Sequence, residues 1–147
     1  MLNLGLLGAG LVMGIAALGS GLGIGYAGQA TIGAWKKCYV ANKPASMMLL
    51  AFAGAPLTQT FYGFILMQQL KAAALDPANA ANGWLYVGFG LASGFAMAFS
   101  AVAQGKAGAA AADAQGETGK GFAQYIAVVG ICETVALFAM VLSMTSL

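Results

Sequence analysis

The chain has 147 residues, of which 61% are hydrophobic and only 7% are charged. Soluble domains carry about 25% charged residues, so this composition predicts an integral membrane protein and leaves no room for a soluble domain. The net charge of +2 comes from a few dispersed lysines that form no basic face, so we expect contact with a lipid bilayer and not with nucleic acid.

Two cysteines are present and histidine is absent. Cys132 lies inside an apolar run and Cys38 at the edge of a connector, so we expect neither a disulfide between them nor a zinc site. The apolar start of the chain, residues 1–20, lacks a basic leader, and its apolar character continues beyond that point. This pattern predicts a retained first helix and not a cleaved signal peptide.

Four apolar segments are each long enough to cross a bilayer, which takes about 20 helical residues. In chain order they are residues 2–34, 46–70, 84–112 and 121–147. The predicted connectors, 35–45, 71–83 and 113–120, contain Pro44, Pro77 and most of the charges. The sequence therefore predicts an all-α membrane protein with four transmembrane helices, arranged as two helical hairpins in tandem.

Lysines are distributed unevenly among the three connectors. The first connector has three lysines and the third has Lys120, whereas the middle one has only Lys71, accompanied by Asp76. Because positive charge is retained on the cytoplasmic side, we expect the first and third connectors in the cytoplasm and both termini outside. The predicted location is the cell membrane, with several crossings.

The two hairpins, residues 1–75 and 76–147, look like copies of each other. Aligning residues 20–30 with 100–110 places Ser, Gly, Ala, Gly and Ala in register. This alignment predicts that the second hairpin is a duplicate of the first.

The second helices of the hairpins align as well, residues 56–64 with 130–138. Gln59 then stands opposite Glu133, and in the first helices Ile24 stands opposite Gln104. The duplication thus retains one carboxylate and replaces the other by a neutral amide, which predicts one ion per chain.

Small residues recur at helical spacing along the first and third predicted helices. Such spacing lets membrane helices approach closely, so we expect these two helices in the inner layer of an assembly and the bulkier second and fourth helices in its outer layer. The residues concerned are Gly21, Gly25 and Gly28, and Ala101, Gly105, Gly108 and Ala112.

Glu133 is the only charged side chain in residues 121–147. If this run spans a bilayer, its carboxylate lies near the midplane, where the ionised form costs several kcal/mol. A lone acid at that depth is expected either to stay protonated or to bind a cation. The alternative is an acid facing a lumen, without a transport role.

Partners of Glu133 follow from the hairpin geometry, since residues equally far from a turn share one depth. The midpoint between Gln104 and Glu133 falls within the third connector, and the repeat brings Gln59 to the same level. Thr58 adjoins Gln59, and Tyr62 lies about one helical turn further along. These side chains could therefore place several oxygens around one point.

Pro56 adds a backbone oxygen to this group. Proline has no N–H to donate to the carbonyl four residues earlier and kinks its helix, and the carbonyl of Ala55 is a candidate ligand in that turn. Oxygen ligands suit a hard cation, whereas a proton needs only the carboxylate. One negative charge balances one monovalent cation, so sodium is favoured, with the Tyr62 hydroxyl holding Glu133 in place. The alternative for each amide is a plain hydrogen bond between helices.

Three segments carrying these residues, 56–64, 103–106 and 132–134, together resemble the proteolipid, or K subunit, of V-type sodium-transporting ATPases. The similarity covers the whole chain, including hairpin order and connector lengths. Leu57 departs from the pattern, because close relatives are expected to have a smaller residue there. That departure affects helix packing and leaves the proposed ligands in place.

The resemblance implies a homo-oligomeric ring of identical subunits that rotates against a stator subunit with an essential Arg, while a central-stalk subunit grips the cytoplasmic rim. ATP is hydrolysed in a separate soluble head, so this chain would not be an enzyme. The resemblance also implies that sodium is bound by Glu133, Gln104, Gln59, Thr58 and the Ala55 carbonyl, with Tyr62 in support.

Two further interpretations remain open from the sequence. One is the same ring carrying protons. The other is a passive pore or a structural oligomer of four-helix chains, which predicts a polar stripe along one helix, whereas the polar residues here cluster at one depth.

Overall fold

A computed structural model describes residues 3–147, which form helices and short connections without a strand. The elements are α1 (Leu4–Val40), α2 (Leu49–Gly54), the 3₁₀ turn η1 (Ala55–Leu57), α3 (Thr58–Leu75), the 3₁₀ turn η2 (Pro77–Asn82), α4 (Gly83–Thr118) and α5 (Phe122–Thr145). Together α2, η1 and α3 make one crossing, so four helical segments within residues 3–147 are long and apolar enough to span a membrane. The predicted all-α, multi-pass membrane fold is confirmed.

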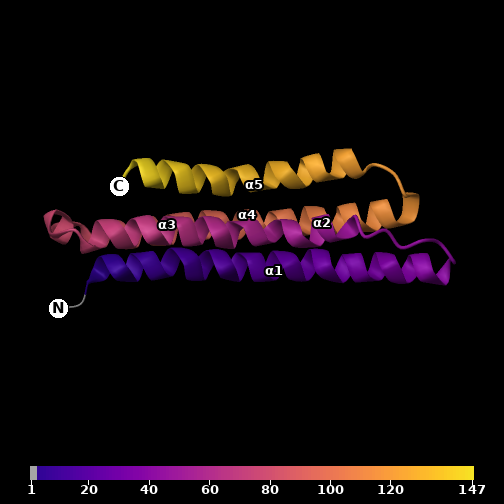
Figure 1. Ribbon diagram of the computed structural model, residues 1–147, viewed down its shortest axis with the longest axis horizontal. Coiled ribbons are helices and arrows are strands. Elements are labelled where there is room, and N and C mark those ends of the chain that lie inside the picture. The colour runs from indigo at the N-terminus through magenta and orange to yellow at the C-terminus, as the bar shows by residue number, and fades with distance from the viewer. Residues whose placement is uncertain (1–2) are drawn as a thin grey trace.

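The long helices lie side by side, with the α1–α2 and α4–α5 connections at one end of the bundle and η2 at the other (Figure 1). α4 packs most extensively against α1 and also contacts α5. α5 lies on the far side of α3 and α4 from α1 (Figure 1). α4 is therefore the central element, with α1 on one face and α5 on another.

The connectors are shorter than predicted. The third was expected at residues 113–120, but α4 continues to Thr118, so Asp113 lies on the helix and that prediction was wrong. A helix of 36 residues is about 54 Å long, well beyond the roughly 30 Å of hydrocarbon, so its last turns need not be apolar. The chain reverses at Gly119 (φ 66°) and Gly121 (φ 90°), a left-handed backbone that glycine adopts without steric cost.

The same correction applies to the other helix ends. α1 runs through Val40 and α3 through Leu75, past the predicted ends at residues 34 and 70. The predicted start of the first segment, Leu2, lies outside the described residues.

Pro56 interrupts the second crossing. It stands in η1, and the backbone N–H of Thr58 donates to the Ala55 carbonyl, closing a tight turn. The predicted break at this proline is therefore present. It sets Thr58 and Gln59 at the first turn of α3, where both side chains reach the interior of the bundle.

Close contact between α1 and α4 depends on Gly23 of α1 and Gly105 of α4. Gly23 and Gly105 face each other so closely that a Cβ on Gly105 would collide with the Gly23 carbonyl. The predicted α4 glycines do pack inside the chain, since a Cβ on Gly108 would lie 2.7 Å from the Phe52 oxygen. The predicted α1 face instead contacts nothing in the described chain at Gly21, Gly25 and Gly28.

Two apolar clusters lie along the bundle on either side of a polar layer. The cluster nearer η2 contains Ala9, Val12, Ala16, Leu66, Leu70, Ala74, Tyr86, Met97 and Ala136. The cluster nearer the α4–α5 turn contains Ala34, Leu49, Phe52, Ala111, Ala112 and Val129. Gln59, Gln104 and Glu133 fall between the two clusters on their respective helices, so the polar layer is closed at both ends by packed hydrocarbon.

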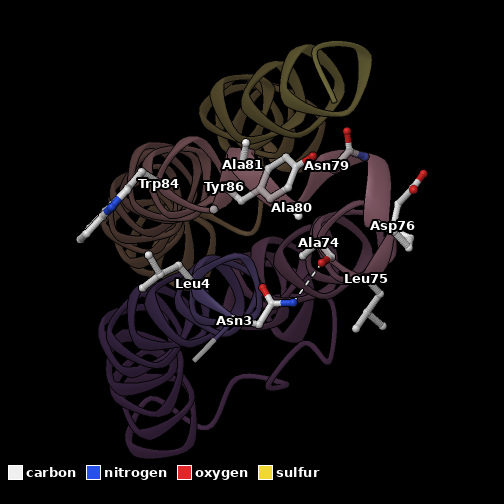
Figure 2. Close-up of a pocket in the computed structure, with 12 residues that line it drawn as sticks. Asn3, Leu4, Ala74, Leu75, Asp76, Asn79, Ala80, Ala81, Trp84 and Tyr86 are labelled. Carbon is white, nitrogen blue, oxygen red and sulfur yellow. Dashed lines mark hydrogen bonds between the residues drawn. The ribbon is translucent and has the colours of Figure 1, made fainter. Parts of the chain in front are cut away.

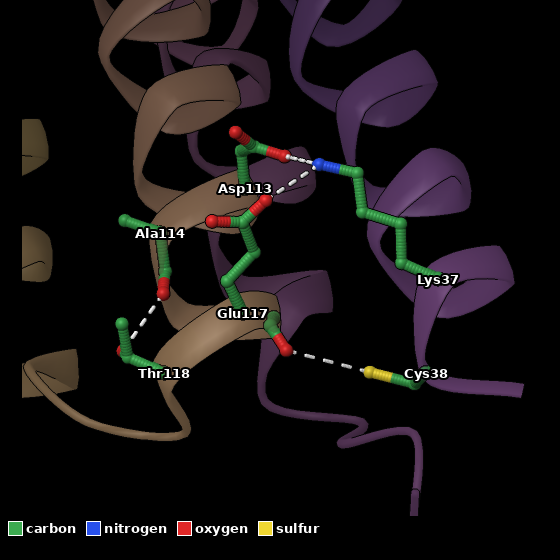
Figure 3. A network of polar contacts seen from close by, with 7 residues as sticks. Lys37, Cys38, Asp113, Ala114, Glu117 and Thr118 are labelled. Atoms are coloured by element: carbon green, nitrogen blue, oxygen red, sulfur yellow. Dashed lines mark hydrogen bonds and ion pairs between the residues drawn. The ribbon is translucent and has the colours of Figure 1, made fainter. Parts of the chain in front are cut away.

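The end of the bundle at the α4–α5 turn carries an ion-pair cluster. Lys37 Nζ of α1 lies 2.7 Å from an Asp113 oxygen and 2.9 Å from a Glu117 oxygen of α4 (Figure 3). Beside it, the Cys38 thiol donates to the Gly116 carbonyl at 3.5 Å (Figure 3). All three charged side chains are more than half exposed, so this cluster lies at the surface and outside the polar layer.

Candidate ion site

Glu133 projects from α5 into the interface with α3 and α4, where it is partly buried. The Tyr62 hydroxyl on α3 donates a short hydrogen bond to Oε1. Nε2 of Gln104 on α4 donates to Oε2 at 3.3 Å. Three helices therefore meet at the carboxylate, and each of its oxygens accepts a hydrogen bond.

Gln104 is fully buried and connects the carboxylate to the rest of the layer. Its Nε2 also donates to the Val129 carbonyl at 3.0 Å, and its Oε1 accepts from Gln59 Nε2 at 2.8 Å. Both ends of the amide are engaged, so its orientation is fixed by groups on α3 and α5.

Two more oxygens lie next to this pair of amides. The Thr58 hydroxyl is 3.1 Å from the Ala55 carbonyl oxygen and 3.3 Å from Gln59 Oε1. Ligand oxygens that share one cation at about 2.3–2.6 Å, as around calcium, are separated by about this distance. The turn at η1 therefore supplies a group of neutral oxygens beside the carboxylate.

All six predicted site residues belong to one continuous network of contacts. Glu133, Tyr62, Gln104, Gln59, Thr58 and the Ala55 carbonyl are linked by hydrogen bonds. Hairpin depth, closeness to Gln59 along the chain and the break at Pro56 predicted these residues, and the structure brings all of them together.

Ser100 and two backbone carbonyls were not predicted. Ser100 Oγ donates to the Cys132 carbonyl at 2.7 Å and accepts from Gln59 Nε2 at 3.3 Å, while the second carbonyl is that of Val129. Ser100 precedes Gln104 by one helical turn on the same face. That spacing was a usable signal in the sequence.

Glu133 is the single carboxylate of this network. Among residues 3–147, no group of three or more His, Cys, Asp or Glu side chains is placed to hold a metal ion. A monovalent cation would be neutralised by the single carboxylate, whereas a divalent cation would keep an excess positive charge in a medium where isolated charge is costly. The donor set therefore fits a monovalent cation or a proton.

A separate hollow of about 440 Å³ opens at the η2 end of the bundle (Figure 2). There the Asn3 side chain donates to the Ala74 carbonyl at 3.0 Å and caps α1, and Asp76 caps η2. The side chains of Asn3 and Asp76 are thus engaged at helix ends. Its lining includes neither of the two buried polar atoms without a partner in the described chain, Ser20 Oγ and Gln115 Oε1.

Part of the chain is similar to known proteins. Residues 87–145 match the family model of the ATP synthase C subunit. The chain is also 36% identical over 96 residues to the A-type ATP synthase subunit K of Methanocaldococcus jannaschii. That alignment covers 65% of this chain and 40% of the relative, so the chain spans well under half of the relative's length. The match over α4 and α5 includes Gln104 and Glu133, so residues 87–145 are similar to the ATP synthase C subunit and the predicted resemblance to the ATPase proteolipids is confirmed.

Proposed function

We propose that this chain is a rotor-ring subunit of a V/A-type rotary ATPase and that it carries sodium on Glu133. The observation that carries the proposal is the polar layer itself. A carboxylate with a donor on each oxygen lies beside neutral oxygens of Gln59, Thr58 and Ala55. Donors on both oxygens suit the ionised form, which needs a cation for neutrality in a membrane.

In the proposed cycle, Glu133 accepts the ion from one half-channel of a stator subunit and crosses the lipid-facing arc as a neutral pair. It releases the ion beside the essential Arg of the stator. A bare carboxylate facing lipid would oppose this rotation by several kcal/mol. The chain itself hydrolyses nothing, and the ring turns because ATP is hydrolysed elsewhere in the complex.

The partners in this proposal are identical copies of the chain. α5 exposes a row of large apolar side chains to lipid or to neighbouring copies, namely Val128, Ile131, Val135, Phe138 and Leu142. On α1, the open positions Gly21, Gly25 and Gly28 would let a neighbouring helix approach closely. The end that carries Lys37, Asp113 and Glu117 would be the cytoplasmic rim that contacts the central stalk.

The proton-carrying ring is the second candidate. It needs Glu133 but makes no use of the oxygens of Thr58, Gln59 and Ala55. A passive pore is disfavoured by the apolar clusters above and below the polar layer, because a conducting path needs polar or wetted surface along its length.

The test is carbodiimide labelling of Glu133 in isolated rings, followed by mass spectrometry across sodium concentration and pH. Carbodiimides attack the protonated carboxyl group, whereas sodium requires the ionised one, so sodium should protect and more should be needed as pH falls. Potassium at equal concentration serves as the ionic-strength control and should protect far less. If sodium protects at no pH, the sodium proposal fails and the proton-carrying ring replaces it.

A further inference from the structure

We infer that Ser100 is a positioning residue for the ion site: it holds the Gln59 amide so that the oxygen, and not the nitrogen, faces the cation. The inference rests on the proposed sodium function and assigns a role to a residue outside the predicted ligand set. A glutamine side chain can turn either end of its amide toward a cation. The two ends of a carboxamide have nearly the same shape, but only the oxygen can bind a cation.

Both hydrogens of the Gln59 amide are accounted for. Nε2 donates to Gln104 Oε1 at 2.8 Å and to Ser100 Oγ at 3.3 Å. Oε1 is thereby directed to the other side, 3.3 Å from the Thr58 hydroxyl. The amide orientation thus depends on two acceptors, one of which is Ser100.

Ser100 can only accept from Gln59, because its single hydrogen is used elsewhere. The hydroxyl donates to the Cys132 carbonyl of α5 at 2.7 Å, and a serine hydroxyl has one hydrogen and two lone pairs. It therefore presents a lone pair to Gln59. The Cys132 carbonyl, next to Glu133 on α5, thus fixes the direction of the hydroxyl hydrogen. The bond that joins α5 to α4 therefore makes Ser100 an acceptor toward Gln59.

A reversed Gln59 amide would be penalised in this environment. Its oxygen would face the Ser100 lone pair and Gln104 Oε1, two acceptors with no hydrogen to offer. Gln59 is fully buried and Ser100 is 4% exposed, so bulk water does not reach the amide to satisfy the reversed form. Buried polar groups left unpaired in this way are destabilising, so the observed orientation is strongly preferred.

A matched control exists on the same helix face. Ser93 lies seven residues before Ser100, about 10 Å along α4, and its hydroxyl is 2.7 Å from that of Ser143 on α5. This bond is buried and crosses the same α4–α5 interface, but it touches no member of the ion network. Ser93→Ala therefore removes an interhelical hydrogen bond of the same kind without affecting Gln59.

The experiment measures sodium protection of Glu133 against carbodiimide in rings of the parent, Ser100→Ala, Ser100→Cys and Ser93→Ala. Loss of one buried acceptor predicts about a tenfold higher sodium requirement for Ser100→Ala. Ser100→Cys retains a weaker acceptor of similar shape and should fall between Ser100→Ala and the parent. Labelling without sodium should follow the same pH dependence in all four, since Ser100 does not contact the Glu133 side chain. Native gels establish that each ring is assembled.

Three results would overturn the inference. Equal sodium requirements in Ser100→Ala and the parent would remove Ser100 from the site while leaving the sodium function intact. Equal losses in Ser100→Ala and Ser93→Ala would assign both serines to helix packing alone. No sodium protection in the parent would overturn the proposed function and this inference with it. If Ser100→Ala does not assemble, the comparison of Ser100→Cys with Ser93→Ala decides on the same criteria.

Discussion

The two sides of α4 hold their neighbours by different means. Toward α1, α4 presents glycines, and the Gly105 backbone rests directly on Gly23. Toward α5 it presents Ser93, Ser100 and Gln104, each of which makes a hydrogen bond across the interface. The first interface depends on the absence of side chains and the second on particular polar ones. Close helix packing and the polar network are thus separated onto two faces of one helix.

Equivalent positions of the two predicted repeats also differ in their polar contacts. Ser20 of α1 aligns with Ser100, yet its hydroxyl is buried without a hydrogen-bond partner in the described chain. Ile24 stands where the second hairpin has Gln104, and it offers no amide. Gln59, the counterpart of Glu133, is engaged in the Glu133 network and does not form a site of its own. The first hairpin therefore lacks the polar face that the second hairpin has, as the prediction of one ion per chain requires.

The largest effect on folding is expected where the glycines of α4 contact α1. Gly105→Leu should prevent folding of the chain, because even its Cβ would overlap the Gly23 carbonyl and neither backbone can move away without separating α1 from α4. Gly25→Leu should leave the single chain folded, since no other helix of the described chain lies within 4 Å of where its Cβ would stand. We expect it to block ring assembly instead. Circular dichroism and protease resistance report the fold, and native gels report assembly.

Gly10→Leu is a further comparison on α1, because this position is open within the chain as well. An assembled, stable ring for Gly105→Leu would contradict the packing of α1 against α4. An unchanged oligomer for Gly25→Leu would show that the open face at Gly21, Gly25 and Gly28 is not a contact between copies.

On the polar face, Gln104→Ile restores the residue type of the first hairpin. It removes a proposed ligand oxygen and leaves Gln59 Nε2 and the Val129 carbonyl without their partner. At least a tenfold loss of sodium affinity should follow from one such buried defect. Glu133 should still take a proton, since protonation needs only the carboxylate. Sodium titration of carbodiimide labelling measures the first effect, and labelling against pH without sodium measures the second.

Ile24→Gln is the reciprocal control for Gln104→Ile. It places an amide at the equivalent position of α1, where no carboxylate lies, and should bind no second sodium per chain. Equal sodium affinity in Gln104→Ile and the parent would remove Gln104 from the ligand group.

Much of this arrangement was predictable because membrane helices are simple to position. Hydropathy fixed the four crossings, and equal distance from a turn fixed the depth of Gln104 and Glu133. A lone carboxylate in an apolar run then identified the centre of the polar layer. Each of these steps uses only spacing along the chain, and that is why residues predicted to lie at one depth do lie together.

The contacts that the sequence did not predict depend on how each helix is rotated about its axis, and not on the depth of its residues. The sequence has many glycines on α1, and spacing alone does not decide whether Gly23 or Gly25 faces α4. Ser100 shares its face with Gln104, but its hydrogen-bond partner is a backbone carbonyl of another helix, which leaves no trace in residue type. The helix ends were placed too early because polar residues such as Asp113 and Glu117 continue a helix once it leaves the hydrocarbon.

The smallest effect is expected at the rim, where α1 and α4 are joined by charge. Lys37 pairs with Asp113 and Glu117 (Figure 3), but all three side chains are more than half exposed, and exposed ion pairs contribute little to stability. Lys37→Met would leave the two carboxylates facing each other one helical turn apart, a mild repulsion that salt screens. We expect a slightly lower melting temperature of the ring at low salt and none of that difference at high salt. Sodium affinity should not change, because Asp113 lies nine residues beyond Gln104, about 13 Å along α4. A clear loss of sodium affinity in Lys37→Met would show that the rim and the polar layer are coupled, and the separation of α4 into a packing face and an ion face would then have to be abandoned.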